Sequence, residues 1–253
     1  GASSGVGKSA IALKIALQAF KQKKKVLIIS REMSKEQVAE RIILHNTGIE
    51  KSKYENRDFK DNDWNNIIKT MGMYSTRNIK IDDKVSTIQE IKREIRLFKP
   101  NLVVIDYVQL LTPSNSKETR ERQVAELSRE LKNITLDFEI PVIQLTQLAE
   151  KGIGNYRPKG ESYTRESRAI YHDSNIVIYL HRVTEEKELE QAYRRVNVFK
   201  ERGSFEDMKA TIENYENKGI RFIEVIVDKN RTGTTGSEYY WFKGSDLNYY
   251  PIV

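Results

Sequence analysis

A run of small residues followed by a lysine and a serine stands near the start of the sequence, as Ala2-Ser3-Ser4-Gly5-Val6-Gly7-Lys8-Ser9. It departs from the phosphate-binding pattern G-x-x-x-x-G-K-[ST] only by the alanine at its first position. Glycines in such a loop let successive backbone N–H groups point inward around a phosphate, and the helix that follows presents its positive N-terminal end. The ammonium group of Lys8 would reach the β and γ phosphates. The residues expected to bind a nucleotide are Ser4, Gly5, Val6, Gly7, Lys8, Ser9 and Ala10.

A carboxylate that could hold a metal ion follows the apolar run at residues 102–105. Asp106 ends this expected strand, and ligands gather at the carboxyl ends of strands in open α/β sheets. Together with the hydroxyl of Ser9 it offers the oxygen ligands that Mg²⁺ prefers. We therefore expect Ser9 and Asp106 to bind Mg²⁺ beside the nucleotide. The alternative is an aspartate that only caps the turn after the strand.

Two further polar residues follow expected strands. Glu32 comes after the apolar run at residues 26–30, and its carboxylate could orient and polarise a water molecule that attacks the γ-phosphate. It could also be a surface glutamate beside a helix cap. Gln147 comes just after the run at residues 142–146, where a neutral donor could sense the γ-phosphate. A glutamine that faces solvent is the alternative.

Apolar runs and helix signals alternate along most of the chain. Runs of the buried-strand type occupy residues 26–30, 102–106, 142–146 and 176–180, with a shorter one at 79–81. Apolar residues at helical spacing follow Lys8, and capping boxes indicate helix starts at Ser34 with Gln37 and at Ser86 with Gln89. A strand pattern that alternates with helices predicts an α/β fold, in which helices flank a mostly parallel sheet.

The last third of the chain has a different pattern. Residues 222–227 and 239–242 flank a Gly-bearing turn, which predicts a C-terminal β-hairpin. Residues 185–218 are charged and helical in character and carry no chemistry that we can identify. Residues 151–168 are rich in Gly, Lys and Arg without periodicity, which predicts a mobile loop. We expect one domain over residues 1–253, and, because a phosphate loop normally follows a strand, a fragment whose upstream domain and linker are absent.

Composition narrows the classes of protein and of site. The sequence contains no Cys and three His, which excludes disulfides and thiolate metal sites and makes a His-rich site unfavourable. No stretch approaches the roughly 18 apolar residues of a membrane span, and the N-terminus lacks a signal pattern. These features predict a cytoplasmic protein without a membrane partner. The formal net charge of +7 leans toward a polyanionic partner, although a well-solvated basic surface is an equal alternative.

The motifs taken together resemble the motor domain of DnaB-type replicative DNA helicases, a branch of the RecA-like ATPases. The resemblance covers nearly the whole chain and rests on seven segments in the same order. After the phosphate loop these are Ser30-Arg31-Glu32-Met33-Ser34, Val104-Ile105-Asp106-Tyr107, residues 122–132, Leu145-Thr146-Gln147-Leu148, Arg165-Glu166-Ser167-Arg168-Ala169-Ile170, and residues 229–236.

The resemblance implies an ATP-driven ring, hexameric as in that family, that translocates on single-stranded DNA and unwinds duplex DNA. Lys8 and Ser9 would bind ATP and Mg²⁺, with Asp106 supporting the metal. Glu32 would activate water, and Gln147 would couple the γ-phosphate to a DNA-facing loop. Lys229 and Arg231 would reach the nucleotide of a neighbouring subunit. The residues implied for DNA binding are Arg165, Glu166 and Arg168, and the implied protein partners are primase and a helicase loader.

Several positions depart from the family pattern. Arg31 stands where the family usually has leucine, and Arg168 replaces a usual glycine. The segment at residues 183–219 is longer than its equivalent. Two other functions stay open: a RecA-like recombination or clock ATPase, against which the segments near Arg165 and Lys229 weigh, and a helicase-like loader or regulator that does not unwind DNA.

Overall fold

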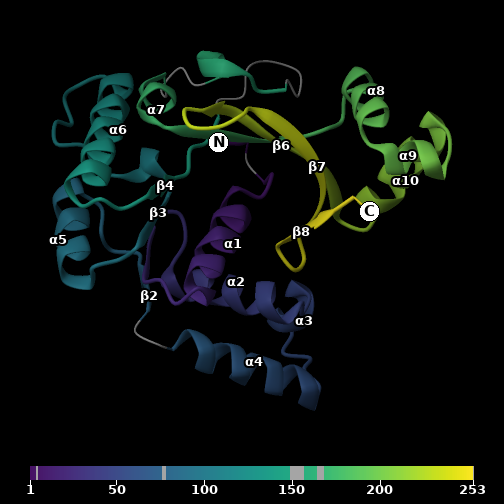
Figure 1. Cartoon of the computed structure of the whole chain (residues 1–253). Coiled ribbons are helices and arrows are strands. Elements are labelled where there is room, and N and C mark those ends of the chain that lie inside the picture. Colours follow the sequence, from purple (N-terminus) through teal and green to yellow (C-terminus); the bar gives the residue numbers. More distant parts are fainter. Residues whose placement is uncertain (4, 76–77, 149–156, 164–167, 253) are drawn as a thin grey trace.

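Two four-stranded sheets form the framework of the molecule (Figure 1). The computed structural model describes residues 1–3, 5–75, 78–148, 157–163 and 168–252. The first sheet is parallel in the order β2-β1-β3-β4, and the second is antiparallel in the order β5-β6-β7-β8. The expected α/β fold with a C-terminal hairpin is thus confirmed.

The parallel sheet consists of β1 (Val26–Ser30), β2 (Ile79–Asp82), β3 (Leu102–Asp106) and β4 (Val142–Gln144). Every residue of β1 and β3 is buried, because helices cover both faces of these central strands. This explains their uninterrupted apolar runs. β1 and β3 have the bounds that the sequence predicts, whereas β4 ends two residues earlier than its apolar run.

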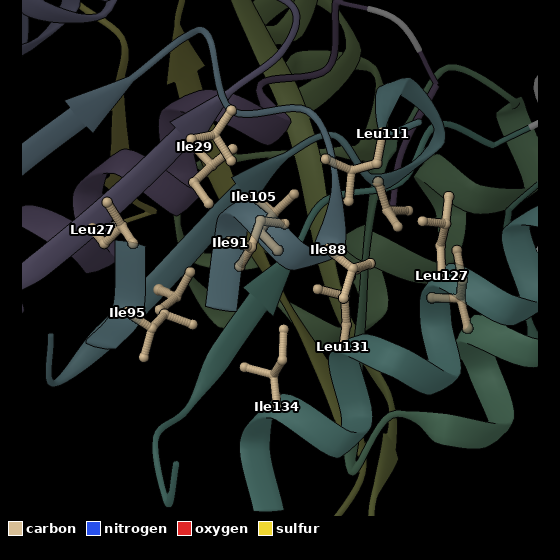
Figure 2. Close-up of a cluster of buried hydrophobic side chains, with 14 of the residues drawn as sticks. Leu27, Ile29, Ile88, Ile91, Ile95, Ile105, Leu111, Leu127, Leu131 and Ile134 are labelled. Carbon is tan, nitrogen blue, oxygen red and sulfur yellow. The ribbon is translucent and has the colours of Figure 1, made fainter. Parts of the chain in front are cut away.

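Alternate residues of β1 supply two separate cores. Leu27 and Ile29 pack against α5 (Ile88–Phe98) and α6 (Arg120–Asp137), as Figure 2 shows. Val26 and Ile28 pack on the other face against α1 (Lys8–Lys21) and α2 (Lys35–Thr47). Successive side chains of a strand point to opposite faces of the sheet, so β1 contributes to the core on both faces, and the sheet lies between two layers of helices.

Of the two capping boxes predicted from the sequence, the structure confirms one and places the other one residue further along. Ser34 and Gln37 form the expected capping box of α2, and Gly48, in a left-handed conformation, caps its carboxyl end. The capping box of α5 is made by Thr87 and Glu90 rather than by Ser86 and Gln89, so that prediction is wrong by one residue. Between α2 and β2 lie α3 (Lys51–Glu55) and α4 (Asp61–Tyr74).

The antiparallel sheet contains β5 (Ile176–Arg182), β6 (Ile220–Asn230), β7 (Gly236–Lys243) and β8 (Asn248–Pro251). The hairpin of β6 and β7 is confirmed, and the Ile176 strand is confirmed as a strand. It does not join the parallel sheet, however, because it pairs antiparallel with β6 along its whole length. β8 was not predicted from the sequence.

The charged segment before β6 is helical, as expected. It forms α8 (Glu186–Arg195), α9 (Asn197–Arg202) and α10 (Phe205–Asn217), which lie at one end of the antiparallel sheet (Figure 1). Phe199, Met208 and Ile212 from these helices pack on Phe222 of β6. Arg182 at the end of β5 pairs with Glu216 of α10 at 2.9 Å. No helix among the described residues is long and apolar enough to cross a membrane.

The first residues of the chain connect the two sheets. Ala2 forms isolated parallel bridges with Gln147, just after β4, and with Leu180 in β5. Its N–H donates to the Thr146 carbonyl at 3.3 Å, and its carbonyl accepts from Leu148 at 3.1 Å. The loop that follows therefore starts at the carboxyl end of the parallel sheet, which is where ligands bind in open α/β folds.

Short helical elements follow β3 and β4. A 3₁₀ turn, η1 (Val108–Leu110), comes directly after β3. The connection from β4 to β5 includes η2 (Gly160–Tyr163), which lies within the expected loop at residues 151–168, and α7 (Arg168–Asp173), which begins at the last residue of that loop. Residues 151–156 and 164–167 of that expected loop lie outside the described residues.

Candidate nucleotide-binding site

The loop before α1 has a backbone that suits an anion. Gly5 and Gly7 have φ angles of 73° and 98°, in the left-handed region that residues with a Cβ rarely adopt. Gly7 is the N-cap of α1 and has no side chain that could accept a hydrogen bond. The first N–H groups of the helix therefore need a ligand or water as their hydrogen-bond acceptor. Ser4, which the sequence also assigns to this site, lies outside the described residues.

Lys8 lies at the centre of the site with its side chain largely buried; the residue is 9% exposed. Burial lowers the pKa of its ammonium group, and the carboxylates of Glu32 and Asp106 act in the opposite direction. Its Nζ lies 5.5 Å from the centre of the Tyr107 ring. The structure thus brings three predicted residues, from the loop and from the ends of β1 and β3, into one electrostatic cluster.

Asp106 is suited to a divalent cation. It is 4% exposed, and burial is the main cause of its raised pKa, with Glu32 adding to the rise. A hydrogen bond from the Ser9 hydroxyl and the charges of Lys8 and Arg41 lower the pKa. Its buried Oδ1 has no hydrogen-bond partner among the described residues. A buried carboxylate oxygen without a partner, next to a hydroxyl, fits Mg²⁺.

Glu32 lies beside Asp106 because β1 and β3 are neighbours. Ser30 and Asp106 are register partners, and the Arg31 N–H continues the pairing by donating to the Asp106 carbonyl at 2.6 Å. The Glu32 side chain is exposed, so water can reach it. The guanidinium of Arg31, which replaces the usual leucine, donates instead to the Asp83 carbonyl after β2 at 2.7 Å.

Gln147 lies at the same edge, held by its backbone rather than by its side chain. Its carbonyl accepts from Gln109 Nε2 at 3.2 Å, and the same amide group donates to Thr146 Oγ1 at 2.8 Å. The Gln109 carbonyl in turn accepts from Arg120 at the start of α6. The Gln147 side chain is exposed and close to the Ala2 bridge that begins the loop.

Lys229 and Arg231 lie away from this cluster, at the far end of β6. Lys229 Nζ donates to the Tyr171 carbonyl at 2.7 Å and to the His172 carbonyl at 3.1 Å, and Arg231 donates to the His172 carbonyl at 3.1 Å. Both side chains therefore bind the carboxyl end of α7, where the partial negative charge of the helix dipole stabilises cations.

Arg168 is the first residue of α7 and is exposed. It thus stands at the opposite end of this short helix from the carbonyl groups that hold Lys229 and Arg231. The other two residues predicted to bind DNA, Arg165 and Glu166, lie outside the described residues.

Some residues near the site were not predicted from the sequence. Arg41 of α2 is close enough to Asp106 to influence its pKa, and Gln109 ties the end of β4 to α6. Arg41 lies on α2 beyond its capping box and belongs to no motif, so only the packing of α2 on β1 reveals it. Tyr107 could have been noticed, because it directly follows Asp106 and faces Lys8.

Known proteins match this chain over nearly its full length. The family model of the DnaB-like helicase C-terminal domain matches residues 1–249. The replicative DNA helicase DnaB of Helicobacter pylori (strain ATCC 700392 / 26695) is 30% identical over 98% of this chain and 54% of its own length. The replicative DNA helicase DnaC of Bacillus subtilis (strain 168) is 33% identical over 93% of this chain and 48% of its own. The chain thus spans about half the length of these two relatives.

Solved structures of related domains also resemble this chain. One of them, a structure of an ATPase domain, superposes with a TM-score of 0.79 at 28% identity, covering 100% of this chain and 83% of that one. A DnaB-like replicative helicase, studied for its interactions with primase, has a TM-score of 0.79 at 29% identity and covers 100% of this chain and 56% of its own. The glycine loop, the Lys8 cluster and these matches together show that the chain belongs to the family of DnaB-like helicase C-terminal domains.

Proposed function

We propose that this chain is the ATP-hydrolysing motor of a replicative DNA helicase, acting as one domain over residues 1–253. The observation that carries the proposal is the cluster of Lys8, Glu32 and Asp106 at the carboxyl edge of the parallel sheet. Membership of the DnaB-like family supports the proposal that ATP hydrolysis drives DNA unwinding. The absence of cysteine is compatible with the cytoplasm, which we propose as its compartment.

The proposed chemistry assigns a separate task to each residue. The N–H groups of residues 5–10 and the Lys8 ammonium bind the phosphates of ATP, and Ser9 and Asp106 hold Mg²⁺. Bound Mg²⁺ would neutralise charge on the phosphate oxygens. Glu32 accepts a proton from water as the water oxygen bonds to the γ-phosphorus and the bond to the β-phosphate oxygen breaks. Gln147 senses the γ-phosphate from the end of β4.

We further propose a hexameric ring in which Lys229 and Arg231 act on the nucleotide of a neighbouring subunit. The path of β6 supports this. Arg221, near the start of β6, contacts Gly5 of its own loop. At a strand rise of about 3.3 Å per residue, Lys229 lies about 26 Å further along. A side chain cannot cover that distance within one subunit, whereas it can reach across an interface.

The proposed partners follow from the same assignment. Arg165, Glu166 and Arg168 would contact single-stranded DNA, with the arginines on its phosphates. A related helicase has been studied with primase, and we propose primase and a helicase loader as protein partners of this one.

The test is to compare ATP hydrolysis and strand separation in the protein and in Glu32→Gln. The protein should hydrolyse ATP faster with single-stranded DNA and separate a forked duplex. Glu32→Gln should bind ATP with unchanged affinity and lose about 10²-fold or more in hydrolysis, the scale of a missing general base. Glu36→Gln, an exposed glutamate on the first turn of α2, is the matched control and should be unaffected.

Two outcomes would contradict the proposal in different ways. Undiminished hydrolysis by Glu32→Gln would remove Glu32 from the catalytic role. Hydrolysis without any strand separation by the assembled protein would favour a loader or regulator that does not unwind DNA.

A further inference from the structure

The carbonyl groups of the nucleotide loop determine where its N–H groups point. The peptide unit is planar and trans, so the carbonyl of one residue and the N–H of the next point in opposite directions. A loop that directs successive N–H groups at a phosphate must therefore direct the preceding carbonyls away from it. Anything that holds those carbonyls outward also holds the N–H groups inward.

Side chains of the antiparallel sheet bind three successive carbonyls of this loop. The Tyr249 hydroxyl of β8 lies 3.1 Å from the Val6 carbonyl and 3.1 Å from the Gly7 carbonyl, and its one proton is shared between them. The Arg221 guanidinium of β6 donates to the Gly5 carbonyl. The Gly7 carbonyl also accepts from the Ile11 N–H of α1 at 3.1 Å. These two side chains, from strands more than two hundred residues along the chain, thus hold the peptide units whose N–H groups belong to Val6 and Gly7, and together with α1 they hold the one that carries the Lys8 N–H.

The Tyr249 hydroxyl is well placed to donate. Its side chain is buried and burial raises the pKa of the phenol, so the proton remains in place at neutral pH. The ring packs on Phe242 with 4.7 Å between ring centres. The Tyr249 carbonyl accepts from Lys14 Nζ of α1 at 3.1 Å, which ties β8 to the helix that follows the loop.

Gly7 shows how closely this contact fits. A Cβ at this position would collide with the Tyr249 hydroxyl and would lie 3.0 Å from the Phe242 ring. Gly7 is therefore required by its φ angle of 98° and also by the side chains that pack against it. The hydroxyl occupies the space that a side chain at residue 7 would need.

We propose that Tyr249 and Arg221 are positioning residues that hold the loop carbonyls outward and so preorganise the N–H groups for the phosphates before the nucleotide binds. This inference rests on the proposed role of the loop as the ATP site. In this proposal both residues act through the loop carbonyls that they bind. They order the Gly-bearing loop before ATP binds, so the loop loses less conformational entropy on binding.

The central test is Tyr249→Phe, which removes the hydroxyl and keeps the ring that packs on Phe242. The measurements are the Kd of a non-hydrolysable ATP analogue with Mg²⁺, the KM and kcat for ATP, and amide hydrogen exchange of residues 5–8 without nucleotide. We expect Kd and KM to rise about 5- to 10-fold, the size of one buried hydrogen bond, while kcat at saturating ATP stays within about twofold. Exchange of these amides should become faster.

Tyr250→Phe is the matched control on the same strand. The Tyr250 hydroxyl bonds to Asp246 Oδ2 at 2.7 Å on the opposite face of β8, and the residue is 43% exposed. Its loss should leave Kd, KM and loop exchange unchanged. Equal effects of the two substitutions would show a general weakening of β8 and would overturn the assignment of Tyr249.

Arg221 gives an independent test should Tyr249→Phe fail to fold. Arg221→Met, at a partly exposed position, should also weaken analogue binding, and Arg221→Lys, which keeps a donor, should recover much of the loss. Unchanged Kd and unchanged exchange in Arg221→Met would overturn the proposal. If the variants weaken binding while the native protein separates no DNA strands, the proposed helicase function fails and the positioning role stands.

Discussion

Asp106 is the residue on which the proposed Mg²⁺ site most depends, because its Oδ1 is buried without a hydrogen-bond partner among the described residues. We expect Asp106→Asn to weaken Mg²⁺ affinity by about 10- to 100-fold and to reduce hydrolysis accordingly, since an amide supplies less charge to the cation. The measurement is the Mg²⁺ dependence of ATP hydrolysis.

Asp137→Asn is the control for Asp106→Asn, because Asp137 is exposed at the end of α6 and lies outside the cluster. An Asp106→Asn variant whose Mg²⁺ dependence matches that of the control would contradict the proposed role of Asp106 in binding Mg²⁺.

The residues that sequence could predict are those that lie beside a local signal. Lys8 belongs to a motif, and Glu32 and Asp106 follow strands whose apolar runs are unambiguous. Arg221 and Tyr249 could not be predicted, because they reach the loop only through the register of a sheet that forms far along the chain. A single sequence contains no sign of that register.

At the scale of elements, α5 carries a pH-dependent cap. Glu90 accepts the N–H groups of Ser86 and Thr87, each at 2.9 Å, and these bonds are the main cause of its pKa falling from 4.5 to about 2. A pKa that is lower in the folded state stabilises the fold above the unfolded value, and the contribution disappears as pH falls from 4.5 toward about 2.

Glu90→Ala should therefore be less stable than the native protein near neutral pH, and the difference should shrink below about pH 4. Urea unfolding at both pH values measures it. The sequence favoured Gln89 as the capping partner, so Gln89→Ala is the natural control and should change the free energy of unfolding by less than about 0.5 kcal/mol. A loss in Gln89→Ala equal to that in Glu90→Ala would contradict the cap seen in the structure.

Strands buried on both faces are the elements that sequence predicts best. β1 and β3 are recognised because such burial demands continuous apolar residues. The direction of β5 is not recognised, because its apolar run is compatible with a parallel or an antiparallel neighbour. β8 is short and ends in Pro251, which conceals it from any pattern of strand residues.

At the scale of the whole molecule, the proposed ring can be tested by mixing subunits. Lys8→Ala lacks the cation of its own site, and Arg231→Ala lacks the one offered to a neighbour. Each variant alone should lose ATP hydrolysis, by about 10³-fold for an arginine finger. Mixed rings contain some interfaces with both residues intact, so mixing should restore part of the activity.

The control mixes Lys8→Ala with the double variant Lys8→Ala and Arg231→Ala, which offers no intact interface. Native mass spectrometry would establish that mixed rings form. If they form and activity does not recover beyond this control, Arg231 does not act across the interface.

β6 has one more consequence for such an assembly. Arg221 stands near one end of the strand and Lys229 near the other, and β5 and β7 pair with it from opposite sides. A strand held in this way cannot stretch, so in the proposed ring it would keep a nearly constant distance between a subunit's own nucleotide site and that of its neighbour. Adding two residues to it would shift the far cations by about 7 Å, more than the reach of a hydrogen bond. The spacing of nucleotides around the ring would then be set by the length of a single strand.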